Sequence, residues 1–139
     1  IETPAAALMS DVLAKEANFF NIGTDALLQY SMACDRLSAS AARLYSFCQP
    51  AFLRLLRIII ENAHREGILV GICGEAAWSK KLVPLFAGMG IDELILDAGA
   101  IPGIREAIGN TSREDKKRFV ENILSLSSAG EVELTLEGF

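Results

Sequence analysis

The sequence has no long hydrophobic run, no cluster of basic residues and few cysteines. Its longest apolar stretch, residues 55–60, is interrupted by Arg57 and is far shorter than the roughly 18 residues that a membrane-spanning helix needs. The net charge is −5, so nucleic acids and anionic membranes are poor candidates as partners. Cys34, Cys48 and Cys73 are odd in number and irregularly spaced, which predicts reduced thiols in a cytoplasmic protein.

The chain also lacks an initiating methionine, a signal peptide and internal repeats. Its 139 residues suffice for one domain but not for two. It opens with Ile1-Glu2-Thr3-Pro4, which leaves no room for a complete first strand, so we expect a chain cut from a longer one. Apolar residues, in contrast, make up 51% of the sequence. This excess predicts strands buried on both faces, as in parallel sheets, or surface that a partner covers.

Helical periodicity alternates with short apolar strands along the chain. Strands are expected at residues 19–22, 68–73 and 93–96, and the alternation of Val132, Leu134 and Leu136 predicts another in the tail. Helices are expected at residues 4–13, 25–33, 50–66, 80–87, 101–108 and 112–126, with an irregular stretch at 35–49. Because a helix follows each of the first three strands, we expect parallel pairing with right-handed crossovers. This α/β pattern fits either a doubly wound sheet or part of an eight-stranded βα barrel.

Two helices have a predicted buried face. The residues expected to face the core in the first helix are Ala5, Leu8, Met9, Val12 and Leu13, with Ser10, Asp11 and Lys15 in solvent. Those expected to face the core in the helix that Pro50 opens are Leu53, Leu56, Ile59, Ile60 and Ala63. Gly67 is expected to end this second helix, because glycine readily adopts the left-handed conformation found there.

Candidate site residues follow the expected strands, because parallel α/β folds place their sites at the C-terminal ends of strands. They are Glu2, Gly23-Thr24-Asp25, Cys73-Gly74-Glu75 and Asp97. Glu2 and Asp25 are candidate ligands for Mg²⁺, with helix capping as the alternative role of such carboxylates. Cys73 is either a partly exposed thiol or a buried, inert one.

Two further basic residues have alternative roles. Arg36 either holds a phosphate through its planar guanidinium or makes a surface ion pair. His64 lies near the end of a helix, where a cation interacts favourably with the helix dipole, so a structural role is expected. From these residues alone, the sequence predicts an α/β domain with an anion or metal site.

Several segments, in this order along the chain, resemble the enzyme I family of phosphoenolpyruvate (PEP)-protein phosphotransferases. They are Ile1-Glu2-Thr3-Pro4-Ala5-Ala6, residues 19–24, residues 28–36, residues 63–67, Cys73-Gly74-Glu75 and residues 88–93. Together they cover nearly the whole chain. Pyruvate phosphate dikinases and PEP synthases share the Gly-Thr and Cys-Gly-Glu elements, but residues 29–36 resemble enzyme I more closely.

The resemblance implies that residues 1–139 form the C-terminal half of a PEP-binding domain, a partial (β/α)8 TIM barrel with its last three or so strands. Such a barrel forms a homodimer and binds PEP with Mg²⁺ at its C-terminal face. A histidine on a separate N-terminal domain takes the phosphoryl group and passes it to a phosphocarrier protein. Because the first half of the barrel and that domain are missing, we expect the chain alone to be inactive.

By the same resemblance, each candidate residue acquires a role. Glu2 matches a magnesium ligand, Arg36 a phosphate-binding arginine, and Cys73 the acid that protonates the enolate carbon to release pyruvate. Asp25 stands at a substrate-contacting position. A proton donor held near that carbon in a shielded site is what this last step needs.

The chain also departs from the family pattern. Where the family has Gly-Thr-Asn-Asp-Leu, this chain has Gly23-Thr24-Asp25-Ala26-Leu27, so Ala26 replaces the second magnesium carboxylate. Asp25 could compensate by a shift of about one residue, but its charge would then approach the substrate phosphate. Tyr45-Ser46-Phe47 replaces a Tyr-Gln-Pro or Tyr-Asp-Pro element. These departures leave an alternative open, a non-catalytic enzyme I-like domain for dimerisation or regulation.

Overall fold

The computed structural model describes residues 1–38, 41, 44–109 and 112–138, and these contain one parallel sheet. Its strands are β1 (Phe19–Gly23), β2 (Leu69–Cys73) and β3 (Glu93–Leu94), in the order β1-β2-β3. Phe19 pairs with Leu69 and Gly23 with Cys73, while Gly71 pairs with Glu93. The three predicted strands and their parallel pairing are therefore confirmed, with bounds that differ by at most two residues.

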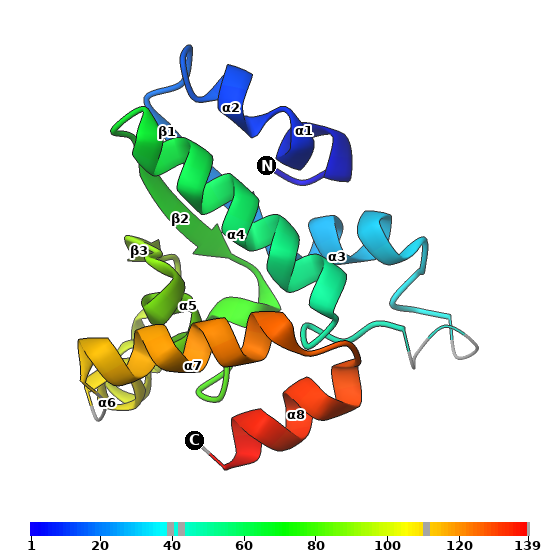
Figure 1. Ribbon diagram of the computed structural model, residues 1–139, viewed down its shortest axis with the longest axis vertical. Helices are drawn as coiled ribbons and strands as arrows, with labels where there is room; N and C mark the ends of the chain where they lie inside the picture. The colour runs from blue at the N-terminus through cyan, green and yellow to red at the C-terminus, as the bar shows by residue number, and fades with distance from the viewer. Residues whose placement is uncertain (39–40, 42–43, 110–111, 139) are drawn as a thin grey trace.

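Helices separate the strands and extend beyond them, which makes the fold mixed α/β (Figure 1). They are α1 (Pro4–Leu8), α2 (Ser10–Leu13), α3 (Thr24–Met32), α4 (Pro50–Arg65), η1 (Glu75–Trp78), α5 (Val83–Met89), η2 (Ala98–Ala100), α6 (Ile101–Gly109), α7 (Arg113–Ser125) and α8 (Ala129–Glu137). Helix α4 runs along the sheet, with α1 and α2 near one end and α7 and α8 near the other (Figure 1). Within the residues described, no helix has both the length and the apolar character needed to cross a membrane.

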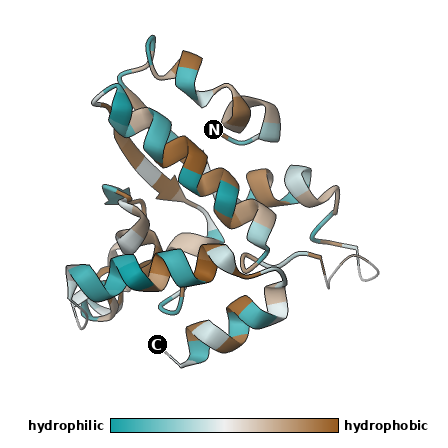
Figure 2. Cartoon of the chain, in the orientation of Figure 1, coloured by the Kyte–Doolittle hydropathy of each residue, from teal (hydrophilic) through white to brown (hydrophobic). Residues whose placement is uncertain are grey.

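Helix α4 is strongly amphipathic, and its polar and apolar residues alternate along the ribbon in Figure 2. Pro50 occupies its first turn, where a missing N–H costs no hydrogen bond, and Gly67 follows its end with a φ of 74°. The predicted inward residues are all buried, and Phe52 joins them. Arg57 makes ion pairs with Glu61, four residues further along α4, and with Glu121 of α7 at 2.9 Å.

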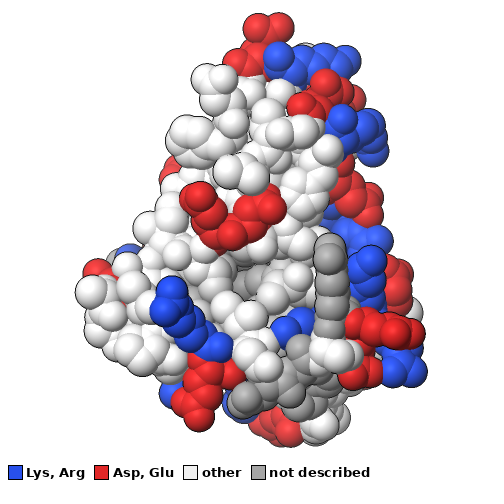
Figure 3. Space-filling view, turned by 90° about the vertical axis from the view of Figure 1, so that its left-hand side faces the viewer, with Lys and Arg blue, Asp and Glu red and all other residues white. Residues whose placement is uncertain are grey.

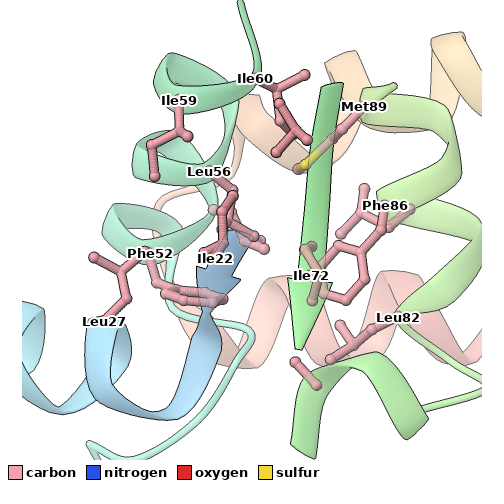
Figure 4. Packing of buried hydrophobic residues seen from close by; sticks show 14 of the residues in the cluster. Ile22, Leu27, Phe52, Leu56, Ile59, Ile60, Ile72, Leu82, Phe86 and Met89 are labelled. Carbon is pink, nitrogen blue, oxygen red and sulfur yellow. The ribbon is translucent and has the colours of Figure 1, made fainter. Parts of the chain in front are cut away.

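The hydrophobic core lies between the sheet and the helices that cover one of its faces. Side chains of α4 and α5 converge around Ile22 of β1 and Ile72 of β2, which are fully buried (Figure 4). Phe52 and Leu56 come from α4, and Phe86 comes from α5. This packing fixes both strands against one layer of helices and so sets the position of the residues at their ends.

The opposite face of the sheet carries apolar side chains that the described chain leaves uncovered. Phe19, Leu69 and Ile95 on this face are 65%, 54% and 49% exposed. With Asn21 and Glu93 they help to line a hollow of about 290 Å³. Asn21 Oδ1 is buried there without a hydrogen-bond partner among the described residues. Apolar surface of this kind accounts for part of the hydrophobic excess of the sequence.

The predicted inward face of the first helix is wrong. The segment divides at Met9 into α1 and α2, and the residues on its buried side are Ala7, Ser10 and Ala14. Asn62 of α4 donates a hydrogen bond to Ser10 Oγ at 2.8 Å, and Ser10 Oγ donates to Ala7 O at 2.7 Å. Small residues allow the close approach to α4, so Leu8, Met9, Val12 and Leu13 are left exposed.

The predicted strand in the tail is also wrong, because residues 132, 134 and 136 lie in helix α8. Ser128 and Glu131 form a capping box, in which each side chain accepts from the other's backbone N–H. Val132 and Leu136, four residues apart, are buried on the same side of this helix. Leu134, 72% exposed, lies on the other side, which a strand would not allow.

Aspartate substitutions at two positions distinguish the helix from a strand. We expect Val132→Asp to lower the free energy of unfolding by about 3 kcal/mol, since it buries an unpaired charge. Leu134→Asp should change it by no more than about 0.5 kcal/mol, because that side chain already faces water. Urea denaturation of both variants measures this difference. Equal losses of unfolding free energy in the two variants would contradict the helix, since a strand would place both residues on one face.

Candidate functional site

The C-terminal ends of β1 and β2 lie side by side and bring the candidate residues to one edge of the sheet. Gly23 at the end of β1 pairs with Cys73 at the end of β2. Directly after β1, Thr24 Oγ1 donates a hydrogen bond to Cys73 O at 2.8 Å. Glu2 packs over Gly23, where a Cβ atom would lie only 2.9 Å from Glu2 Oε1. Glycine at position 23 therefore leaves the room that the Glu2 carboxylate occupies.

Both carboxylate oxygens of Asp25, in the first turn of α3, accept hydrogen bonds from the protein. Tyr45 Oη donates to Asp25 Oδ1 at 2.9 Å, and the backbone N–H of Glu75 donates to Asp25 Oδ2 at 3.0 Å. Gly74 permits this approach, because a Cβ there would lie 2.0 Å from Asp25 Oδ2. Asp25 thus satisfies the first N–H of η1, which is a capping role.

Tyr45 is a site residue that sequence reasoning missed. It lies in a stretch predicted to be irregular, where Tyr45-Ser46-Phe47 departs from the family pattern, and its spacing gives no indication of a contact with Asp25. Burial raises the pKa of Tyr45 to about 12, and the hydrogen bond to Asp25 and the negative charges of Asp25 and Glu75 act in the same direction. Tyr45 is therefore a neutral hydrogen-bond donor to Asp25 at neutral pH.

The high pKa of Tyr45 can be measured by ultraviolet absorbance. Subtracting the titration of Tyr45→Phe from that of the wild type removes the contribution of Tyr30. We expect a midpoint near pH 12, against the ordinary value of 10.0. Because the folded pKa is raised, the stabilisation from this proton is complete below pH 10.0 and is lost as the pH rises through about 12. A difference curve with its midpoint at pH 10.0 or below would contradict the contact with Asp25.

Arg36 reaches the same edge from the segment that follows α3. Its Nη1 lies 3.4 Å from Glu75 Oε1, and its backbone N–H donates to Gln29 Oε1 at 3.1 Å. The side chains of Arg36 and Glu75 are 48% and 62% exposed, so their ion pair contributes little to stability. The ion-pair alternative is thus observed, and the Arg36 side chain, 48% exposed, remains accessible to another anion.

The thiol of Cys73 is partly exposed at this edge. Its Sγ lies 3.5 Å from Ile22 O, to which it can donate a weak hydrogen bond. Cys73 differs in this respect from Cys34, which is buried. Cys73 is therefore not fully buried, which agrees with the first of its two alternatives.

Two other candidate residues, His64 and Asp97, make no hydrogen bond or ion pair with the described residues at the C-terminal ends of β1 and β2. Nε2 of His64 lies 2.9 Å from Oδ2 of Asp92, which also accepts from the backbone N–H of Val70 at 2.9 Å. His64 therefore links α4 to the start of β3, which is the structural role expected of it. Asp97 precedes η2 and makes no hydrogen bond to Asp25, Cys73 or Glu75 in the described part of the chain.

The residues at this edge do not fit a magnesium site formed by this chain alone. Glu2 makes no hydrogen bond or ion pair with the described residues, whereas both oxygens of Asp25 are already engaged by the protein. Ala26 has no ligand atom. Among the residues described, no three His, Cys, Asp or Glu side chains form a group able to hold a metal ion. Of the two predicted carboxylates, Glu2 is the one without a protein partner among the described residues, whereas Asp25 is held by two hydrogen bonds.

Comparison with known proteins gives matches over most of the chain. A family model described as the PEP-binding domain of PEP-utilising enzymes matches residues 1–113. The PEP-protein phosphotransferase of Bacillus subtilis (strain 168) is 42% identical over 132 residues, which cover 95% of this chain. Those of Geobacillus stearothermophilus and Listeria monocytogenes are 44% and 41% identical over the same length. The chain spans 23% of the length of these curated relatives.

Proposed function

Since the chain belongs to the family of PEP-binding domains of PEP-utilising enzymes, we propose that it forms part of the PEP site of a PEP-protein phosphotransferase. One observation carries this proposal. Arg36 and Cys73, which match the family's phosphate-binding arginine and proton donor, lie at the edge where β1 and β2 end. The names of the relatives do not favour a non-catalytic domain.

The proposed architecture is part of a (β/α)8 barrel. Three parallel strands with helices on one face support it, as does the uncovered opposite face with Phe19, Leu69 and Ile95. In such a barrel this second face lies inside, and substrate binds at the C-terminal ends of the strands. Figure 3 shows a largely uncharged area on one side of the molecule, with acidic side chains across its middle and a hollow below them. The remaining strands of the barrel would come from sequence beyond residues 1–139.

The proposed chemistry assigns one step to each of two side chains. The guanidinium of Arg36 exchanges its exposed contact with Glu75 for the phosphate of PEP, whose oxygens its planar N–H groups match. After the phosphoryl group has left for a histidine on another domain, the enolate of pyruvate remains. The methylene carbon of this enolate takes the proton from Cys73 Sγ, which leaves pyruvate and a thiolate that solvent reprotonates.

The metal is not assigned a step, because the residues at this edge do not fit one. Glu2 is the carboxylate that would face a cation bound with PEP, which would neutralise phosphate charge if present. Transfer to a phosphocarrier protein and homodimer formation are further proposals. Both rest on the relatives' name, because the apolar face of the sheet lies inside the proposed barrel and is not counted as a dimer contact.

The chain alone should bind PEP weakly. Glu2, Asp25 and Glu75 place three carboxylates at the edge, against the single guanidinium of Arg36. Titration calorimetry with saturating Mg²⁺ should show no heat above dilution. A dissociation constant below about 1 mM, roughly 4 kcal/mol of binding, would contradict this charge argument.

A chimera tests the proposed function. The 132 residues of this chain that match the Bacillus subtilis enzyme would replace the corresponding segment of that enzyme, which restores the rest of the barrel. We expect the chimera to bind PEP, and Arg36→Ala to weaken this binding at least about tenfold. Cys73→Ala should slow the release of pyruvate with little change in PEP affinity. Arg65→Ala, on the exposed side of α4, serves as the control and should change neither. If Arg36→Ala leaves the PEP affinity of a folded chimera unchanged, the proposal is overturned.

A further inference from the structure

The position of Asp25 is the feature of this site that the family pattern explains least. We propose that Asp25 is a positioning residue, which together with Tyr45 fixes the Cys73-Gly74-Glu75 turn instead of binding a cation. The proposal rests on the proposed function only for the role of the Cys73 thiol. The placement of the turn itself is argued from contacts within this chain.

Two side chains at the start of α3 hold this turn. Thr24 Oγ1 donates to Cys73 O at 2.8 Å, and Asp25 Oδ2 accepts from Glu75 N at 3.0 Å. Between these two contacts lies Gly74, whose φ of 99° and ψ of −175° belong to no regular element. Glycine reaches this conformation at little cost but also reaches others, so the contacts on either side select it. Without Asp25, one of the two contacts would be lost and the N–H of Glu75 would have no acceptor within the described protein.

Asp25 is in turn held by the hydrophobic core. Tyr45 donates to Asp25 Oδ1 at 2.9 Å, and the ring of Tyr45 packs edge-on against Phe47 at 5.7 Å. Phe47 contacts the ring of Phe52 at 5.8 Å, and Phe52 is fully buried on α4. A continuous series of contacts therefore runs from the buried face of α4 to the backbone beside the thiol.

This arrangement explains why Asp25 does not compensate for Ala26. Each oxygen of Asp25 already accepts a hydrogen bond, so a cation would have to share an oxygen with Tyr45 or with the N–H of Glu75. Asparagine can keep both contacts. Its Oδ1 can accept from Glu75 N while its Nδ2 donates to Tyr45 Oη, a hydroxyl that accepts as well as donates. Hydrogen bonding, and not the negative charge, is then what position 25 supplies.

The test uses this chain with Asp25→Ala, Asp25→Asn and Tyr45→Phe, and with Asp11→Ala on exposed α2 as the control. Two quantities are measured at one pH: hydrogen exchange of the Glu75 amide, and the rate of Cys73 alkylation by iodoacetamide, resolved from Cys34 and Cys48 by peptide mass spectrometry. Asp25→Ala should speed Glu75 exchange at least tenfold and change Cys73 alkylation several-fold. Asp25→Asn and Asp11→Ala should stay within twofold of the wild type, with Tyr45→Phe between.

Two results would overturn the proposal. One is Glu75 exchange that is unchanged in a folded Asp25→Ala variant, or, if that variant fails to fold, unchanged in Tyr45→Phe. The other is saturable protection of the Glu75 amide by MgCl₂ that Asp25→Asn abolishes, which would make Asp25 a cation ligand. Neither measurement involves PEP. A chimera that fails to bind PEP would therefore contradict the proposed function without contradicting this inference.

Discussion

Gly74→Ala is expected to lower the free energy of unfolding by about 2–5 kcal/mol, from backbone strain together with overpacking. Its φ of 99° with a ψ of −175° is a conformation that essentially only glycine adopts. A Cβ atom there would also lie 2.0 Å from Asp25 Oδ2 and 2.6 Å from Thr24 Oγ1. The turn must therefore shift, and Cys73 with it.

Urea denaturation measures this loss, and two further variants separate its causes. Gly74→Ala in an Asp25→Ala background removes the nearest steric conflict, so the additional loss should be smaller there. Gly130→Ala is the matched control, because nothing lies within 4 Å of its added Cβ and the residue is in α8. It should stabilise the protein by about 0.5–1 kcal/mol. Wild-type stability of Gly74→Ala would contradict the conformation of the turn.

Phe52→Ala is expected to cost about 3–5 kcal/mol, the usual loss for a buried phenylalanine. The side chain is fully buried on α4 and contacts Phe47, so its removal leaves a cavity between the helix and the sheet. A domain of this size has about 5–15 kcal/mol in total, so the variant should be marginally stable.

The control for Phe52→Ala is Ile58→Ala on the same helix. Ile58 is 37% exposed, so its truncation should cost about 1 kcal/mol or less. The shift in the urea midpoint gives both values. Similar losses for the two variants would mean that α4 does not bury the face described here. Phe52→Ala should also speed hydrogen exchange at Glu75, because Phe47 and Tyr45 connect the two residues.

The sequence predicted the elements whose patterns are local. Residues 19–22 and 68–73 form compact apolar runs that end at glycine or cysteine, and both are strands of the parallel sheet. Helix α4 was predicted with its inward face because long amphipathic periodicity, an initial proline and a final glycine agree. Site residues at strand ends were predicted because parallel pairing brings those ends to one edge.

Features that depend on contacts between distant segments were not predictable in this way. Ser10 is buried because Asn62, which is 52 residues away, donates to it, whereas periodicity favoured the larger Leu8 and Met9 as core. In the tail, the alternation of apolar residues obscured the Ser128–Glu131 capping box. The partnership of Asp25 with Tyr45 depends on the path of the segment after α3, which no spacing in the sequence reports.

Protection of Cys73 by PEP tests most directly the claim that the substrate binds where β1 and β2 end. In the chimera with the Bacillus subtilis enzyme, iodoacetamide alkylation of Cys73 is followed by peptide mass spectrometry at increasing PEP concentration. We expect PEP to lower the alkylation rate at least about tenfold, with a midpoint at the dissociation constant that calorimetry gives. In Arg36→Ala, PEP should no longer protect Cys73 at these concentrations. An unchanged Cys73 rate at PEP concentrations that saturate the calorimetric signal would place the substrate elsewhere and contradict the account.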